Sequence, residues 1–311
     1  MKNPELKERF KSWIPHGMEF IGPDQTERIL AGCARLREAF AALGAREVIP
    51  PLLDFAPTFE MARQSEMASF QTRDMAGELL AFRSDLTVQI IKAAASGVFG
   101  QPGNYSYVQT IVLDAAAGSG HRRELLQAGI EFLGPADRRV ETMIGLIADI
   151  RKDAIIVYGD TSFLRALLSG LSESDFAAAM KILDRKDIQG LRSFCESRSV
   201  QNSTAQILCE LPFLSGASLD PLKQAAAGRS DLLEIIAAAP RFSQIVYDFG
   251  LVRDLSYYTG PVFQGYLPGG HEPFVSGGVY DGLFEKFSGR PLAACGLAFD
   301  VMLLTGPNQG R

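Results

Sequence analysis

The chain has 311 residues, 47% of them hydrophobic, and its 31 lysines and arginines against 36 aspartates and glutamates exclude a strongly basic nucleic-acid-binding surface. Its four cysteines and three histidines are scattered, which argues against a zinc site or a disulfide framework and fits a reducing cytoplasm. The N-terminus is charged and no apolar run reaches the length of a bilayer, so neither a signal peptide nor a membrane segment is expected.

The first predicted elements are a helix and an edge strand. Residues 24–43 carry apolar side chains at helical spacing, and Gly44 is placed to end that helix. Residues 46–54 read as a strand interrupted by Pro50 and Pro51. Proline has no backbone donor and is tolerated at a strand edge or end, so this strand is expected at a boundary, where a subunit interface would lie.

A second helix and a β-hairpin follow. Residues 78–83 read as a strand, and Ser84 is the expected cap of a helix that runs to about Ser96. Strands are then expected over residues 105–113 and 123–134, joined by a loop of small residues that is typical of a hairpin.

The return strand of this hairpin has two unlike faces. Alternation puts its apolar side chains on one face, namely Leu126, Ala128, Ile130 and Phe132. The other face carries Gln127 and Glu131 with Gly129 between them, a polar floor with a gap at its centre. A glycine in such a place often marks the close approach of a ligand or of backbone. The alternative is the solvent-facing side of an ordinary antiparallel sheet.

The middle of the chain is predicted to be an insertion. A helix over residues 137–150 and a buried strand over 154–158 come first. Residues 172–240 are alanine-rich, patterned as helices and without strand candidates, so we expect a helical insertion between two sheet-forming segments. Sheet residues resume at 241–247.

The C-terminal part is dense in glycine. Residues 261–266 are expected to form a strand and residues 275–283 a turn or strand edge, where Gly277 and Gly278 indicate closely packed backbone. The apolar residues 295–304 read as a closing helix.

One stretch of this region, Gly250-Leu-Val-Arg-Asp-Leu-Ser-Tyr-Tyr-Thr-Gly260, is unusual because a strand would have polar groups on both of its faces. As a strand it would place Arg253 and Tyr257 on one face and Tyr258 on the other. It is either a half-exposed strand whose tyrosines favour β structure or the wall of a ligand site.

Taken together, the polar residues have a specific chemistry. Asp85, Gln127 and Glu131 provide carboxylates and an amide that suit an ammonium group, and Arg253 suits a carboxylate. The adjacent tyrosines offer flat walls for a ring. A small amino acid with a ring side chain would satisfy all of these groups, within an α+β fold.

Several ordered motifs resemble those of histidyl-tRNA synthetases. The stretch Leu251-Val-Arg-Asp-Leu-Ser-Tyr-Tyr258 is similar to the first histidine-specific motif, and Gly277-Gly-Val-Tyr-Asp281 to the second. Ile14-Pro-His-Gly-Met18 resembles the N-terminal motif of that family, Phe82-Arg-Ser-Asp-Leu-Thr87 resembles its Leu-Arg-Pro-Glu-Gly-Thr, and Gln127-Ala-Gly-Ile-Glu131 the end of its second class II motif. The resemblance spans residues 14–304 and implies a class II synthetase-like antiparallel sheet flanked by helices.

The departures from that family are as informative as the matches. Leu113 and Ala115 stand where the synthetases have an arginine and a glutamate of the ATP site. The closing motif, Val301-Met-Leu-Leu304, carries no charge where the synthetases have Glu-Arg. Removing two preorganised cations from the phosphates would cost several kilocalories per mole of transition-state stabilisation, so adenylate formation is not expected. In the first histidine motif Asp254 and Ser256 replace the usual glycine and aspartate.

This combination resembles the regulatory subunit that accompanies the short form of ATP phosphoribosyltransferase. The resemblance implies a non-catalytic, cytoplasmic protein without cofactor or metal, which dimerises near Pro50 and assembles with the catalytic subunit in histidine biosynthesis and its feedback control. It implies a core of residues 1–171 and 241–311, an insertion of residues 172–240, and no anticodon-binding domain. Neither nucleic acid nor a membrane is expected as a partner.

The resemblance also implies a histidine site. Its residues would be Asp85, Thr87, Gln127 and Glu131 around the ammonium group, Arg253 near the carboxylate, and Tyr257, Tyr258 and Tyr280 around the imidazole. Two other functions stay open: an ATP-dependent amino-acid-activating enzyme related to histidyl-tRNA synthetase, and a stand-alone histidine-binding protein.

Overall fold

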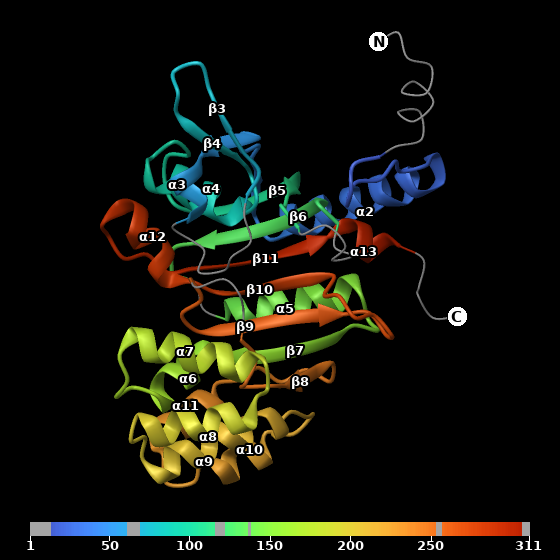
Figure 1. Cartoon of the computed structure of the whole chain (residues 1–311). Coiled ribbons are helices and arrows are strands. Elements are labelled where there is room, and N and C mark those ends of the chain that lie inside the picture. Colours follow the sequence, from blue (N-terminus) through green and yellow to red (C-terminus); the bar gives the residue numbers. More distant parts are fainter. Residues whose placement is uncertain (1–13, 61–68, 116–121, 136–137, 253–256, 307–311) are drawn as a thin grey trace, which may run out of the picture.

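A large, mostly antiparallel sheet forms the centre of the protein. The computed structural model describes residues 14–60, 69–115, 122–135, 138–252 and 257–306. The strands of the large sheet are β1 (Arg46–Glu47), β5 (Asn104–Val112), β6 (Glu124–Leu133), β7 (Ile155–Asp160), β8 (Ile245–Tyr247), β9 (Pro261–Tyr266), β10 (Val275–Val279) and β11 (Ala294–Asp300). Within the described residues their order is β1-β5-β6-β11-β10-β9-β7-β8 (Figure 1). The outer pairs, β1 with β5 and β7 with β8, are parallel, and the inner pairs are antiparallel.

Helices cover both faces of this sheet. One face packs against α2 (Pro23–Ala42), α5 (Arg139–Ile150) and α13 (Val301–Thr305), which share one apolar core with β6 and β11. The other face packs against α4 (Leu86–Ala95) and α12 (Asp281–Ser288), which share a second core with β5. Because β6 runs through the middle of this arrangement, each of its side-chain rows is enclosed between sheet and helix.

A small second sheet stands beside the large one. It consists of β2 (Leu53–Phe55), β4 (Leu79–Phe82) and β3 (Gln71–Arg73) in that order, with the short helix α3 (Ala56–Glu60) next to it. Its β3–β4 hairpin projects from the body of the protein at the top of Figure 1.

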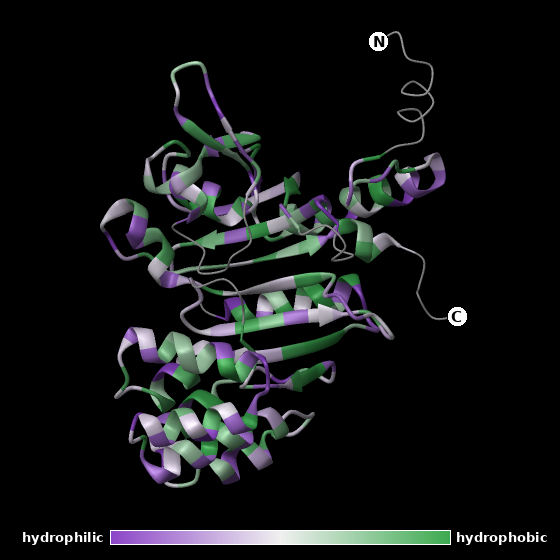
Figure 2. Ribbon diagram, viewed as in Figure 1, coloured by the Kyte–Doolittle hydropathy of each residue, from purple (hydrophilic) through white to green (hydrophobic). Residues whose placement is uncertain are grey.

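The connection between the parallel strands β7 and β8 is entirely helical in its regular elements. Its members are α6 (Thr161–Leu167), α7 (Glu173–Asp184), α8 (Ile188–Ser197), α9 (Asn202–Glu210), the 3-10 turn η1 (Leu211–Phe213), α10 (Asp220–Ala225) and α11 (Ser230–Ala237). A parallel pair requires such a crossover. These helices gather beyond β7 and β8, and Figure 2 shows hydrophobic and hydrophilic bands on them, as expected for helices with one buried face.

The predicted α+β architecture is confirmed, and several elements fall close to their predicted ranges. The first helix, the hairpin strands β5 and β6, and β9 agree with the sequence patterns. The run of helices over residues 172–240 is present as well, although the boundaries of a separate domain stay a prediction. No helix within the described ranges is both long and apolar enough to cross a bilayer.

The predicted strand over residues 46–54 is wrong as a single element. It is divided into β1 and β2, which belong to different sheets. Buried Arg83 fixes the segment between them, because its Nη1 donates to the Pro50 carbonyl oxygen at 2.8 Å and its Nε to the Thr110 carbonyl oxygen at 2.5 Å. Burial lowers the pKa of Arg83 from its usual value.

The prediction for the C-terminal region also needs correction. Residues 294–300, predicted as part of a helix, form the central strand β11, and α13 begins only at Val301. Residues 275–279, predicted as a turn or strand edge, form β10, which is paired on both sides. A strand buried on both faces has no polar alternation, so its sequence looks like that of a buried helix.

Candidate ligand-binding site

Most of the predicted site residues lie together on the α4 side of β6. Glu131 is at the centre of this group and forms a hydrogen bond with Thr87 and another with Tyr280. Asp85 and Tyr257 are joined by a hydrogen bond, and Tyr258 contacts the ring of Tyr280. Arg253 lies outside the described residues.

Glu131 is enclosed almost completely, with 1% of its surface exposed. Thr87 Oγ1 donates to its Oε1 at 2.6 Å, and the Tyr280 hydroxyl donates to its Oε2. Burial raises the pKa of Glu131 to about 8, and the negative charge of Asp85 also raises it, whereas the hydroxyl hydrogen bonds act in the opposite direction. An empty site therefore holds a carboxyl group that is largely protonated at neutral pH.

Asp85 owes its position to the start of a helix. It is the N-cap of α4, and its Oδ1 accepts a hydrogen bond from the backbone N–H of Val88 at 3.3 Å. The sequence prediction named Ser84 as this cap, which is wrong by one residue. The second carboxylate oxygen of Asp85 accepts from the Tyr257 hydroxyl at 3.4 Å. Asp85 is half-buried and so retains some contact with water.

Three tyrosine rings form a cluster over Glu131. The ring centroids of Tyr257 and Tyr258 are 5.0 Å apart, those of Tyr257 and Tyr280 are 5.5 Å apart, and those of Tyr258 and Tyr280 are 6.2 Å apart. The strand predicted for residues 250–260 is wrong in its described part, where Tyr257 lies in a turn. Strand alternation would have separated Tyr257 from Tyr258, whereas the turn brings both rings into one cluster.

Tyr107 is a site residue that the sequence patterns missed. It is 1% exposed on β5, paired opposite Gly129 of β6, and its hydroxyl interacts with Thr87 and Glu131. A Cβ on Gly129 would overlap the Tyr107 phenol. The gap predicted at the centre of the polar floor is therefore filled by Tyr107. The signal was present in the hairpin register, which puts Tyr107 across from the glycine.

Gly296 is a second residue that the patterns missed. It is paired with Glu131 on neighbouring strands, and a Cβ at this position would overlap Glu131 Oε2 and lie 2.5 Å from the Tyr280 hydroxyl. The site thus depends on a glycine from a strand that contributes no functional side chain at this point.

We expect Gly296→Ala to lower the free energy of unfolding by about 1–3 kcal/mol, because the added methyl group overpacks a filled region. Gly145→Ala is the matched control, since Gly145 lies within α5 and its added Cβ would meet no atom within 4 Å. Alanine in a helix should be neutral or stabilising there by up to about 1 kcal/mol. Urea unfolding followed by circular dichroism measures both. Equal stability of the two variants would contradict the close packing described for Gly296.

The comparison with known proteins now decides the family. The sequence profile described as histidyl-tRNA synthetase matches residues 17–304. The chain belongs to this family. The predicted resemblance to its regulatory relatives is also confirmed. A protein of Leptospira interrogans (serovar copenhageni) named ATP phosphoribosyltransferase regulatory subunit is 27% identical, with 94% of this chain and 93% of the relative covered.

Further relatives agree with this result. A Geobacter metallireducens protein of the same name is 27% identical over 96% of this chain and 74% of its own length. Among solved structures, a Bacillus halodurans C protein described as ATP phosphoribosyltransferase regulatory subunit/histidyl-tRNA synthetase has a TM-score of 0.81 at 23% identity, covering 96% of this chain and 84% of its own. Histidyl-tRNA synthetase from Nostoc sp. PCC 7120 has a TM-score of 0.72 at 18% identity, with 94% and 74% covered. These structures confirm the class II synthetase-like fold.

Relative to the family motifs, the hairpin end of the site lacks the expected charges. Leu113 and Ala115 are half-buried and buried, and they offer no charged group. The nearby arginines are engaged locally: Arg122 pairs with Asp300 at 2.6 Å, and Arg123 donates to the Ala115 carbonyl oxygen at 2.7 Å. Neither guanidinium thus replaces the missing arginine in the arrangement described.

Gln127 is half-buried at this same end of β6 and lies between two polar neighbours in register. It is opposite Gln109 of β5 and Asp300 of β11. Since side chains in register share a face of the sheet, Gln127 continues the polar row that begins at Glu131.

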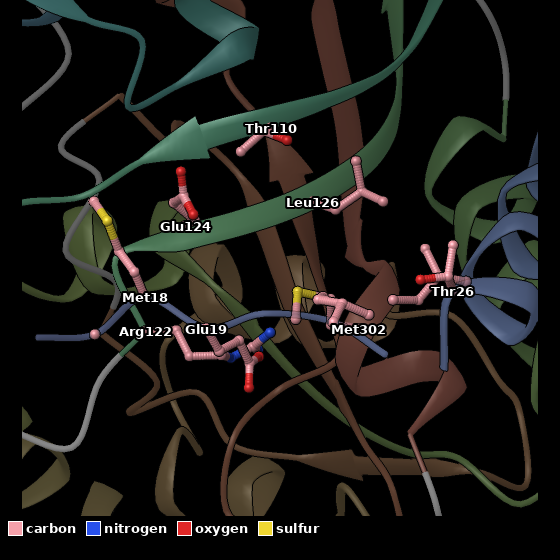
Figure 3. A pocket seen from close by; sticks show the side chains of 11 residues that line it. Met18, Glu19, Thr26, Thr110, Arg122, Glu124, Leu126 and Met302 are labelled. Carbon is pink, nitrogen blue, oxygen red and sulfur yellow. The ribbon is translucent and has the colours of Figure 1, made fainter. Parts of the chain in front are cut away.

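A pocket of about 290 Å³ lies on the opposite face of the hairpin (Figure 3). Thr110, Glu124 and Leu126 line it from β5 and β6, while Thr26 of α2 and Met302 of α13 line its other side. None of the predicted ligand residues borders it. Because alternate residues of β6 point to opposite faces, this pocket and the Glu131 cluster are separated by the sheet.

Proposed function

We propose that this protein is a non-catalytic regulatory subunit of ATP phosphoribosyltransferase, which acts in the cytoplasm in the first step of histidine biosynthesis and in its feedback control by histidine. The observation that carries the proposal is the contrast within one site: the ligand cluster around Glu131 is retained, while positions 113, 115 and 301–304 have no charge. The names of the relatives, which match over nearly the whole chain, support it.

Its partners are a second copy of the chain and a short-form catalytic subunit. Exposed apolar side chains support the dimer contact near Pro50 and Pro51, since Ile49 is 80%, Leu52 48% and Phe55 51% exposed. Such a group of exposed apolar residues marks an interaction surface. The helical insertion of residues 172–240 would be a separate structural unit of this subunit. The net charge of −5 supports the absence of a nucleic-acid partner.

Histidine is the proposed ligand of the Glu131 cluster. Asp85, Thr87 and Gln127 would surround its ammonium group and Arg253 its carboxylate, as the family motifs imply. The packing supports a different role for Glu131 than the ammonium contact inferred from sequence. Glu131 is enclosed by tyrosines, which suit a flat ring, whereas Asp85 keeps contact with water, which suits a strongly hydrated ammonium group. Glu131 would then meet the imidazole.

The principal rival is an amino-acid-activating enzyme, which membership of the synthetase family favours. We expect the purified protein to bind histidine without activating it. Titration calorimetry should detect binding, and histidine-dependent exchange of pyrophosphate into ATP should stay at background, because the phosphates would lack their arginines. A histidyl-tRNA synthetase assayed in parallel is the positive control. Measurable exchange would support the enzyme and refute the regulatory function.

The second rival is a stand-alone histidine-binding protein. Co-purification with a short-form catalytic subunit separates this alternative from the proposal. A regulatory subunit should elute with its partner in a single complex during size-exclusion chromatography. Separate elution at micromolar concentrations of both chains would favour the stand-alone protein.

A further inference from the structure

The environment of Glu131 has a consequence for the protonation of the bound ligand. Both carboxyl oxygens of Glu131 are engaged by neutral hydroxyl groups, from Thr87 and Tyr280, in a region that is 1% exposed to solvent. Among the described residues, the charged group that acts on it is Asp85, another carboxylate. Ionising Glu131 in the empty site thus places a charge away from water and beside a like charge, which is unfavourable.

The other titratable groups around Glu131 come from each element that packs against it. They are Asp85 before α4, Tyr107 on β5, Tyr257 before β9, Tyr280 before α12 and Cys295 on β11. Burial raises the pKa of all three tyrosines well above the usual value and that of Cys295 to about 12. Within this described group, Glu131 is thus the residue that changes charge between pH 6 and 9.

Imidazole brings the complementary property. Its unperturbed pKa is about 6.5, so the ring of free histidine is mostly neutral at pH 7 and has one nitrogen that accepts a proton. A neutral carboxylic acid can donate to that nitrogen, and an ionised one can accept from an imidazolium N–H. Either arrangement contains the same single proton.

We propose that Glu131 and the ring of the bound ligand share one proton, so that the site selects amino acids whose side chain is a ring base. The inference rests on the proposed histidine site. The proton starts on a carboxyl oxygen of Glu131 and ends between that oxygen and a ring nitrogen, so near pH 7 it comes neither from solvent nor returns to it. A ring without a basic nitrogen leaves the buried carboxyl group without this partner.

This arrangement predicts a bell-shaped dependence of histidine affinity on pH. Below about pH 6.5 the free ring carries a second proton, which must be released on binding. Above about pH 8 Glu131 loses its proton in the empty site, and one must be taken up. We expect the association constant to be highest between these values and to fall by up to about tenfold per pH unit on either side.

Calorimetry of the full chain with histidine, from pH 5.5 to 9 and in two buffers of different ionisation enthalpy, measures both affinity and proton exchange. At pH 7 the net proton exchange should be close to zero. In Glu131→Gln the alkaline decrease that arises from Glu131 should be lost. Asp160→Asn is the matched control, because Asp160 is a buried carboxyl group that caps α6, and burial raises its pKa as well. This variant should retain both sides of the bell.

Three results would overturn the proposal. Release of nearly one proton at pH 7, with affinity rising up to pH 8, would mean that Glu131 binds the ammonium group in its ionised form. An affinity that does not change with pH, or equal binding of phenylalanine, would mean that no proton is shared. Failure to bind histidine at every pH would instead refute the proposed ligand, which is distinguishable from binding with another pH profile.

Discussion

Mixing this protein with a short-form ATP phosphoribosyltransferase catalytic chain is expected to raise the rate of phosphoribosyl transfer to ATP, and histidine is expected to reverse the increase. A coupling free energy of about 1–3 kcal/mol corresponds to a change of roughly 5- to 150-fold. The physical requirement is that histidine binds the inhibited arrangement of the complex more tightly than the active one, since equal affinity would shift nothing. Steady-state rates of the catalytic chain, alone and with increasing amounts of this protein, provide the measurement.

Substitution of one hydroxyl group separates assembly from ligand response. Thr87→Val removes the donor to Glu131 Oε1 while keeping the shape of the side chain. This variant should still activate the catalytic chain but require more histidine for inhibition, by about tenfold if the lost hydrogen bond to a charged or proton-sharing group is worth 1.5 kcal/mol. Thr142→Val is the matched control, because its Oγ1 donates to Arg138 within α5, away from the site. A mixture no more active than the catalytic chain alone would refute the regulatory function.

The second large effect concerns stability in the absence of ligand. The pKa of Glu131 is about 8 in the folded protein against an ordinary value of 4.5, so the folded state binds more protons than the unfolded state between these pH values. The contribution of Glu131 to the free energy of unfolding should therefore be highest below about pH 4.5 and decrease as pH rises to about 8. The expected slope approaches about 1.4 kcal/mol per pH unit within that window.

Glu131→Gln tests this directly because glutamine has a similar shape and does not ionise. The difference in unfolding free energy between variant and wild type should shift in favour of the variant as pH rises from 5 to 8. Denaturant unfolding at several pH values measures the difference and cancels the contributions of all other titrating groups. A difference that is constant with pH would mean that Glu131 titrates normally in the folded protein.

Local patterns in the sequence were sufficient for elements whose surroundings are uniform along their length. The helix predicted over residues 24–43 spans Pro23–Ala42, because one face of it meets the core and the other meets water. The two faces of β6 followed from alternation in the same way, and this placed Gln127 and Glu131 in one row. The family motifs then supplied the candidate site, since they occur in order along most of the chain.

What the tertiary structure decided concerns residues whose neighbours are distant in sequence. The sequence by itself determined the α+β class, the polar row of β6 and the composition of the ligand cluster. Only the folded chain showed that residues 294–300 form a central strand, because burial on both faces removes the alternation that identifies a strand. Only sheet pairing placed Tyr107 across from Gly129 and Gly296 beside Glu131. These contacts exclude water from Glu131 and thereby set its pKa, which no local pattern encodes.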